Sequence, residues 1–289
     1  MRGARVVMQV KQALKYLNPS EVRDAARLPV TIEIGAASPE MYEEIEQALL
    51  GNNVTAEKRA DAKRWLRRAG ESGMAATIRI YEESMPHREG TFLYRSGQPR
   101  QVIREVLAAR QDLSLALARR FPAFRQCVVS EIIKSVSKEN ALFSLATAVP
   151  SMVPFLSLPY ALGEFASDTA FLTMNQVRMA FLLAGASDRD VGYRDQKAEI
   201  GSIVAGAFGW RALARELAGK IPMGGGLIPK AAIAYAGTFV AGQSLDRYYR
   251  LGYGFTPSER EKAYTEAFAR GKAIASQMLD AYRSKQKTA

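Results

Sequence analysis

The sequence contains a single cysteine and a single histidine, and this scarcity excludes several kinds of site. One cysteine cannot form a disulfide framework, and such usage suits a reducing compartment. One cysteine and one histidine are also too few for a zinc site, and His87 lies alone in MPHREG without an evident catalytic partner. We expect His87 on an exposed loop and Cys127 as a small buried side chain of a helix. No metal, cofactor or catalytic residue is predicted.

The chain also lacks a long, uninterrupted apolar run. Residues 140–163 carry no charge, but three prolines divide them, and a straight spanning helix does not tolerate such prolines. Residues 200–210 are too short to cross a bilayer, and residues 221–245 are split by three successive glycines and a proline. We expect helices of a soluble bundle here, with insertion into a membrane interface as the alternative and a spanning helix least favoured.

The N-terminal residues 1–27 do not have the pattern of a signal peptide. Lys11 and Lys15 interrupt the apolar positions, and no small-residue cleavage site follows. The segment is typical of a basic amphipathic helix. Such a helix either docks on the protein's own surface or lies on a membrane surface.

What is present is a folded, strongly basic chain. Its 289 residues, of which 48% are hydrophobic and 24% charged, are enough for one large domain or two ordinary ones. The net charge is +11 and the pI is about 9.8. This charge favours anionic partners such as phospholipid surfaces, nucleic acid or acidic proteins, and it does not choose among them.

The first 110 residues alternate between segments typical of strands and of helices. This order predicts a small α/β domain at residues 28–109. Ser38 as N-cap and Pro39 at the first helical position mark one helix start clearly. We expect strands at 28–35, 75–82 and 91–95, and helices at 38–50, 55–70 and 98–109.

From residue 110 onward the sequence has no convincing strand, which predicts an all-helical bundle at 110–253. A polar helix at 254–289 follows, and Thr256 with Glu259 forms a capping box at its start. The fold class is therefore α+β overall, a small α/β domain followed by a larger all-α bundle. The expected helices are 113–149 with a break near Pro122, 160–185, 195–219, 230–250 and 256–284.

The stretch VTIEIGAASPEMYEEIEQALLG at 30–51 has the outline of a phosphate-binding loop: a strand, a glycine and a helix. The full pattern G-x-x-x-x-G-K-[ST] is missing, since the second glycine, the lysine and the hydroxyl are all absent. Carboxylates in the first helical turns would also repel phosphate. We expect no standard GTP binding. The domain is either a degenerate GTPase-like scaffold or an unrelated α/β domain.

Four blocks between Glu139 and Gly252 carry a family resemblance. In order they are ENALFSLATAVPSMVPFL, ASDTAFLTMNQVRMAFLLAG, EIGSIVAGAFGWRALARELAGKIP and GGGLIPKAAIAYAGTFVAG. Together they resemble an uncharacterised helical domain family found at the C-terminus of some Era-like GTPases and in YcjF-type inner-membrane proteins of bacteria. The resemblance implies membrane association or a GTPase-like partner. It favours the degenerate GTPase-like interpretation of residues 28–109, and nucleotide hydrolysis is not carried over.

A polar stripe on the expected helix 160–185 is the first candidate site. Its members share one helical face among strongly apolar neighbours. One interpretation is structural: they form a buried hydrogen-bond network or the solvent-exposed face of the helix. The other is functional: they line a groove for an anionic headgroup or a partner. The stripe comprises Glu164, Asp168, Asn175 and Arg178.

Three basic residues extend this candidate groove. Arg211 and Arg215 lie one turn apart, so they can hold a phosphate together or pair with acids such as Glu199 or Asp168. Lys230 follows three glycines at a helix start, which either binds an anion or is a tight interhelical loop.

The run KRWLRR is a second candidate surface. A tryptophan among arginines can stack on a nucleic-acid base or sit in a lipid interface. The alternative is a solvated helix face with Trp65 packed inward. The basic residues of this run are Lys63, Arg64, Arg67 and Arg68.

These features favour a non-enzymatic, bacterial-type cytoplasmic protein, free or associated with the inner membrane. Its expected partner is an anionic membrane surface or a GTPase-like protein, and it is either a monomer or an oligomer. The alternative is an enzyme or a binder of a small anionic ligand, with a polar site around Asp168 and Arg178. Nucleic-acid binding through KRWLRR is a weaker third hypothesis.

Overall fold

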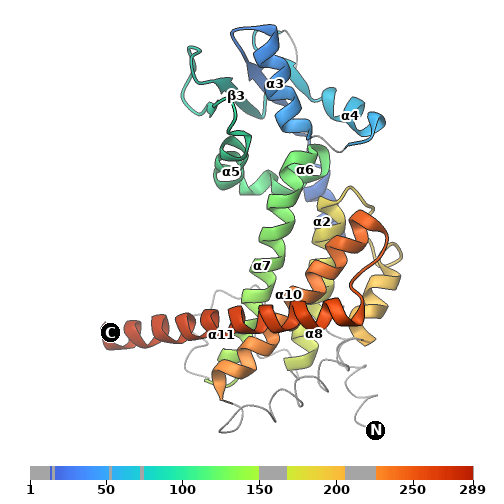
Figure 1. Ribbon diagram of the computed structural model, residues 1–289, viewed down its shortest axis with the longest axis vertical. Helices are drawn as coiled ribbons and strands as arrows, with labels where there is room; N and C mark the ends of the chain where they lie inside the picture. The colour runs from blue at the N-terminus through green and yellow to red at the C-terminus, as the bar shows by residue number, and fades with distance from the viewer. Residues whose placement is uncertain are drawn as a thin grey trace. The chain divides into compact units, whose positions relative to one another are not determined.

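The computed structural model describes residue 14 and residues 17–51, 54–71, 75–149, 168–205 and 226–288 (Figure 1). Helices predominate and one four-stranded parallel sheet is present, which confirms the α+β fold class. The chain divides into two compact units. The unit that contains the sheet comprises Ser20–Ser130 and Ala184–Val191, and the helical unit comprises Met1–Pro19, Glu131–Leu183 and Gly192–Ala289.

The sheet unit is built on β1, which pairs in parallel with β2 on one edge and β3 on the other. The strand order is β2-β1-β3-β4, and all three pairings are parallel. The strands are β1 (Ile32–Gly35), β2 (Leu66–Arg68), β3 (Ile78–Glu82) and β4 (Phe92–Tyr94). The helices are α2 (Pro19–Ala26), α3 (Pro39–Leu50), α4 (Ala56–Lys63), α5 (Pro99–Ala109), the short α6 (Ser114–Arg120) and the first turns of α7 (Pro122–Ala146).

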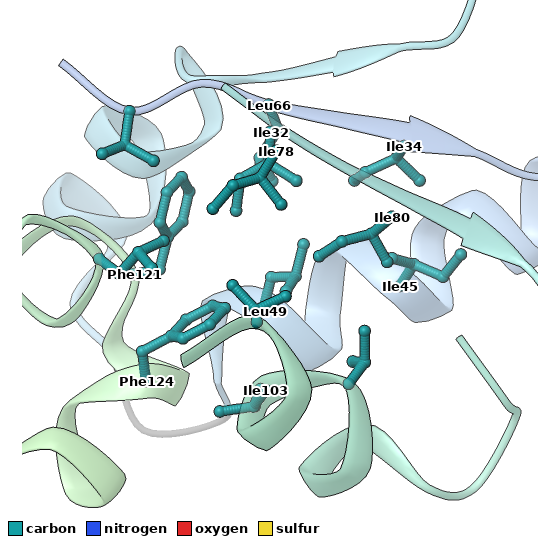
Figure 2. Packing of buried hydrophobic residues seen from close by; sticks show 14 of the residues in the cluster. Ile32, Ile34, Ile45, Leu49, Leu66, Ile78, Ile80, Ile103, Phe121 and Phe124 are labelled. Atoms are coloured by element: carbon teal, nitrogen blue, oxygen red, sulfur yellow. The ribbon is translucent and has the colours of Figure 1, made fainter. Parts of the chain in front are cut away.

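One face of the sheet forms the core of this unit. Ile32 and Ile34 of β1 are almost fully buried, as is Ile80 of β3. Figure 2 shows these side chains facing α3, with α5 and the aromatic residues at the start of α7 closing the core. The apolar residues alternate with polar ones along β1, because successive side chains point to opposite faces of a strand.

The other face of the sheet is polar and centred on Glu33. Its carboxylate lies 3.6 Å from the Arg67 guanidinium on β2 and 3.7 Å from the Arg79 guanidinium on β3. The Tyr81 hydroxyl donates a 2.8 Å hydrogen bond to the same carboxylate, which raises the pKa of Tyr81. Parallel sheets usually bury both faces in apolar contacts, so this charged cross-strand group explains why β1 alternates rather than forming a continuous apolar run.

Gly35 is required by the ring of Tyr81. A Cβ atom at position 35 would lie only 2.5 Å from Cγ of Tyr81. The two residues are register partners on β1 and β3, so the ring lies flat over the glycine. The glycine at the end of β1 is therefore explained by packing rather than by the approach of a phosphate.

The expected helix 55–70 is wrong in its second half. Helix α4 ends at Lys63, and Leu66–Arg68 forms the edge strand β2. The backbone N–H of Ile32 donates to the Trp65 carbonyl oxygen (2.9 Å), and the N–H of Ala69 donates to the Ile34 carbonyl oxygen (2.9 Å). These bonds hold the segment against β1. Lysine and arginine favour helices locally, and pairing with the sheet overrides this preference.

The remaining elements of the sheet unit were predicted correctly in type. Helix α3 begins as expected, with the Ser38 hydroxyl accepting from the Met41 N–H (3.2 Å) and with Pro39 at the first position. Strands β1, β3 and β4 lie within the expected segments, and α5 matches its predicted range to within one residue. Helix α2 was not anticipated as a separate element.

The helical unit contains long helices, as predicted. They are the later part of α7, most of α8 (Asp168–Ala186), a helical segment at 197–205, α10 (Leu227–Leu251) and α11 (Pro257–Thr288). The break near Pro122 separates α6 from α7 as expected. The capping box is also confirmed, since the Thr256 N–H donates to Glu259 (2.9 Å) and the Glu259 N–H donates to the Thr256 hydroxyl (3.3 Å).

Helices α10 and α11 pack against each other (Figure 1), and their close approach depends on a glycine. A Cβ atom at Gly271 would lie 3.0 Å from the Ala232 carbonyl oxygen, so the two backbones approach closely there. Most of residues 1–16 and of the expected helix 195–219 lie outside the described residues. Among the helices that are described, none is long and apolar enough to cross a membrane.

We expect Gly35→Ala to destabilise the protein by about 1–3 kcal/mol, because the added methyl group overlaps the Tyr81 ring. In a Tyr81→Ala background the same change should cost almost nothing, and the coupling energy from this double-mutant cycle measures the contact. Urea denaturation followed by circular dichroism gives the free energies. Gly201→Ala is the control, since a methyl group there meets open space. Equal costs in both backgrounds would contradict the assignment.

Candidate functional site

The loop after β1 lies at the point where α/β sheets usually bind phosphates. The strand order reverses between β1 and β3, and ligands of such sheets sit at the carboxyl ends of these strands. In this protein the Ala37 N–H donates a 2.8 Å hydrogen bond to the Glu82 carboxylate. The Ser84 hydroxyl donates to its other oxygen (2.7 Å). The Glu82 carboxylate therefore accepts the hydrogen bond that the Ala37 N–H could otherwise donate to a bound anion.

The two hydrogen bonds to Glu82 lower the pKa of its carboxyl group, the Ala37 N–H having the larger effect. A second carboxylate, Glu44, accepts bonds from the Ser96 hydroxyl (2.8 Å) and the Tyr94 hydroxyl (2.9 Å), which lower its pKa. This edge of the sheet thus presents acceptors where a nucleotide phosphate needs donors.

The basic residues of KRWLRR are mostly engaged within the sheet unit. Lys63 pairs with Glu46 at 2.5 Å, Arg67 lies beside Glu33, and the Arg68 guanidinium stacks 4.1 Å above the Tyr42 ring. Arg64 is exposed, and no partner for it occurs among the described residues.

Trp65 packs against the core of the sheet unit. The Arg120 guanidinium lies 3.6 Å from the centre of its ring, and burial lowers the pKa of this arginine. With Arg120 against one ring face and the core beside it, the structure favours the interpretation in which Trp65 packs inward.

The predicted polar stripe contributes to a hydrogen-bond network between three helices of the helical unit. The Asn140 amide of α7 donates to the Thr238 hydroxyl of α10 (2.7 Å). The Asn175 amide of α8 donates to the Asn140 oxygen (2.9 Å). All three residues are nearly fully buried, so these bonds form in a low-dielectric interior.

An ion pair closes one side of this network. Arg178 of α8 pairs with Glu139 of α7, and its Nε donates to the Asn175 oxygen (2.8 Å). The Asn175 amide also donates to Glu139 (3.2 Å). The guanidinium of Arg178 is therefore committed to internal partners, which favours the structural interpretation of the stripe over an anion-binding groove.

Of the other predicted groove residues, only Lys230 has a described side chain, and it lies outside this network. Asp168 is the first residue of α8, and Glu164, Arg211 and Arg215 lie outside the described residues. Lys230 donates to the Thr147 hydroxyl (3.1 Å). The sequence analysis missed Glu139, Asn140 and Thr238, although a buried polar stripe on one helix implies polar partners on its neighbours.

A cavity of about 570 Å³ adjoins the network in the helical unit. Helices α8 and α10, the segment 197–205 and residues 254–260 line it. Gln176 connects the two features, because it lines the cavity and its amide donates to the Thr238 hydroxyl (3.2 Å). A volume of this size lies in the range of small-molecule sites.

The described residues contain no cluster of acids, cysteine and histidine suited to a metal. His87 is exposed, with Nδ1 3.0 Å from the Met85 carbonyl oxygen. Cys127 is half-buried against the core of the sheet unit rather than fully buried. Among the residues that the structure describes, neither has the neighbours of a catalytic nucleophile or base.

No protein-family model, curated protein or solved structure matches this chain. These comparisons therefore add no family, ligand or activity. The resemblance of residues 139–252 to the helical domain family stays an expectation from the sequence. The function must be argued from charge and geometry.

We expect Asn140→Leu to lower the free energy of unfolding by at least about 2 kcal/mol. The change leaves the buried amide of Asn175 and the hydroxyl of Thr238 short of partners. Lys138→Leu, two residues earlier on the exposed face of α7, should change it by no more than about 0.5 kcal/mol. Denaturant titration of both variants provides the measurement. An Asn140→Leu variant as stable as the control would show that the network contributes little.

Proposed function

We propose that this protein is a non-enzymatic, peripheral binder of anionic phospholipid surfaces, and that its helical unit makes the contact. The main support for this proposal is the unequal distribution of charge between the two units. The sheet unit contains 18 Lys/Arg and 17 Asp/Glu, a net charge of only +1. Because the whole chain carries +11, the helical unit carries +10.

The local ion pairs of the sheet unit support this assignment. Lys58 pairs with Asp188 (2.6 Å), and Arg95 pairs with Glu83 (2.6 Å). Lys63 and Arg67 have acidic partners as well, as described above. A unit whose charges are balanced internally exerts little attraction on a distant anionic surface.

The mode of attachment follows from the excess positive charge. Each Lys or Arg near an anionic leaflet contributes about 1 kcal/mol, and the attraction decays within a Debye length. On the described residues no helix is suited to spanning, so the contact we propose is electrostatic. The resemblance to a helical domain family whose members are often membrane-associated is a further reason for choosing lipid as the partner.

An enzyme or anionic-ligand site around Asp168 and Arg178 is less well supported. The guanidinium of Arg178 already bonds to Glu139 and Asn175. A ligand anion would have to displace a carboxylate that is held in place by two side chains. In the loop after Gly35, the Ala37 N–H is likewise already bonded to the Glu82 carboxylate.

Vesicle flotation tests the proposal directly. We expect the protein to float with vesicles of equal parts phosphatidylcholine and phosphatidylglycerol, but not with phosphatidylcholine alone. Salt at ~1 M, where the Debye length is about 3 Å, should release it. The variant Lys134→Glu/Lys138→Glu, which reverses two exposed charges on α7, should reduce the bound fraction about tenfold or more.

The matched control is Arg100→Glu/Arg104→Glu on α5 of the sheet unit. It reverses two exposed charges at the same spacing. Equal losses in both double variants would assign binding to total charge rather than to the helical unit. Flotation that survives salt would indicate apolar insertion, and the absence of flotation would overturn the proposal in favour of a protein partner, sought next by pull-down.

A further inference from the structure

A buried carboxylate lines the cavity of the helical unit without a protein partner. Glu199 lies in the helical segment 197–205, and the residue is only 8% exposed. It lines the cavity, and within the described residues it makes no hydrogen bond or ion pair. The carboxylate oxygens are not sealed in the interior but open onto the cavity, where a ligand can reach them.

The position of Glu199 in its helix does not account for this burial. The residue lies in the first turn of the segment that begins at 197, where the positive end of the helix dipole favours an acid. That field stabilises an exposed carboxylate as well as a buried one. Arg211, which the sequence analysis offered as one possible partner of Glu199, lies outside the described residues, and no ion pair to Glu199 occurs among the residues that are described.

The remaining cavity lining is largely apolar, and its polar groups are mostly in use. Apolar walls come from Ile203, Val240, Leu245 and Phe255. The Ser244 hydroxyl accepts a bond from the Phe255 N–H (3.1 Å), and the Gln176 amide is bonded to Thr238. Arg260 is exposed and forms no ion pair with Glu199. The cavity thus combines an apolar body with one buried acid, Glu199, and one exposed base, Arg260, which are not paired with each other.

We propose that this cavity binds an organic cation with an apolar or aromatic body, whose ammonium group pairs with the Glu199 carboxylate. The ligand cation supplies the missing counter-charge, and its apolar part contacts the aliphatic and aromatic walls. The +10 charge of the unit repels cations at long range. Salt at physiological strength screens this repulsion beyond about 8 Å. The attraction between the ligand cation and the nearby Glu199 carboxylate therefore dominates inside the cavity.

Three indole compounds of matched shape and different charge test the proposal: tryptamine (cationic), tryptophol (neutral) and indole-3-acetate (anionic). Isothermal titration calorimetry on the full-length protein, without lipid, measures their affinities. We expect tryptamine to bind at least about tenfold more tightly than the other two. Glu199→Gln should remove this preference, whereas Glu261→Gln, at an exposed position of α11, should preserve it.

Ala241→Phe provides a second, independent variant, since its larger side chain fills the cavity and should abolish binding of all three compounds. Circular dichroism checks that each variant is folded. If Glu199→Gln does not fold, the loss of binding in Ala241→Phe tests the proposal together with the ranking of the three compounds. Equal binding of the three compounds, no binding of any, or tryptamine binding unchanged in either variant would overturn the proposal. The outcome is independent of the proposed membrane role, because no lipid is present.

Discussion

The Glu33 carboxylate is the interaction on which the architecture of the sheet unit depends. It lies on the central strand between an arginine of β2 and an arginine of β3, and it accepts the Tyr81 hydroxyl. A single acidic side chain thus links three strands on the polar face, while the residues on either side of it enter the core. Because the polar side chains of this face pair with one another across the strands, β1 alternates between polar and apolar residues.

Internal pairing of charged side chains extends to the rest of the sheet unit, and this pairing distinguishes it from the helical unit. Carboxylates at the ends of the strands accept the bonds that a bound anion would otherwise take, and most basic side chains of KRWLRR meet a carboxylate or an aromatic ring. The helical unit carries an excess of positive charge, and its cavity contains a carboxylate, Glu199, that is not paired among the described residues. These two imbalances, rather than any sequence motif, direct the functional proposals.

The sequence predicted most elements because their signals are local. Ser38 and Pro39 fix the start of α3, and the capping box of Thr256 and Glu259 fixes the start of α11. Strand β2 was missed because Leu66–Arg68 is extended only through its pairing with β1. Of the polar stripe, Asn175 and Arg178 were identified, but their partners come from other helices and no periodicity within one helix reveals them. The cavity beside Glu199 likewise exists only after the helices are assembled.

The hydroxyl of Thr238 has a consequence for how this chain can evolve. It accepts from Asn140 and from Gln176, and it donates to the Ala234 carbonyl (2.9 Å), so a single oxygen uses its full hydrogen-bonding capacity. Serine is the other small side chain with the same capacity, while valine has the shape but removes the hydroxyl that accepts from both amides. In descendants of this sequence, position 238 should therefore drift only between threonine and serine until the two amides change with it.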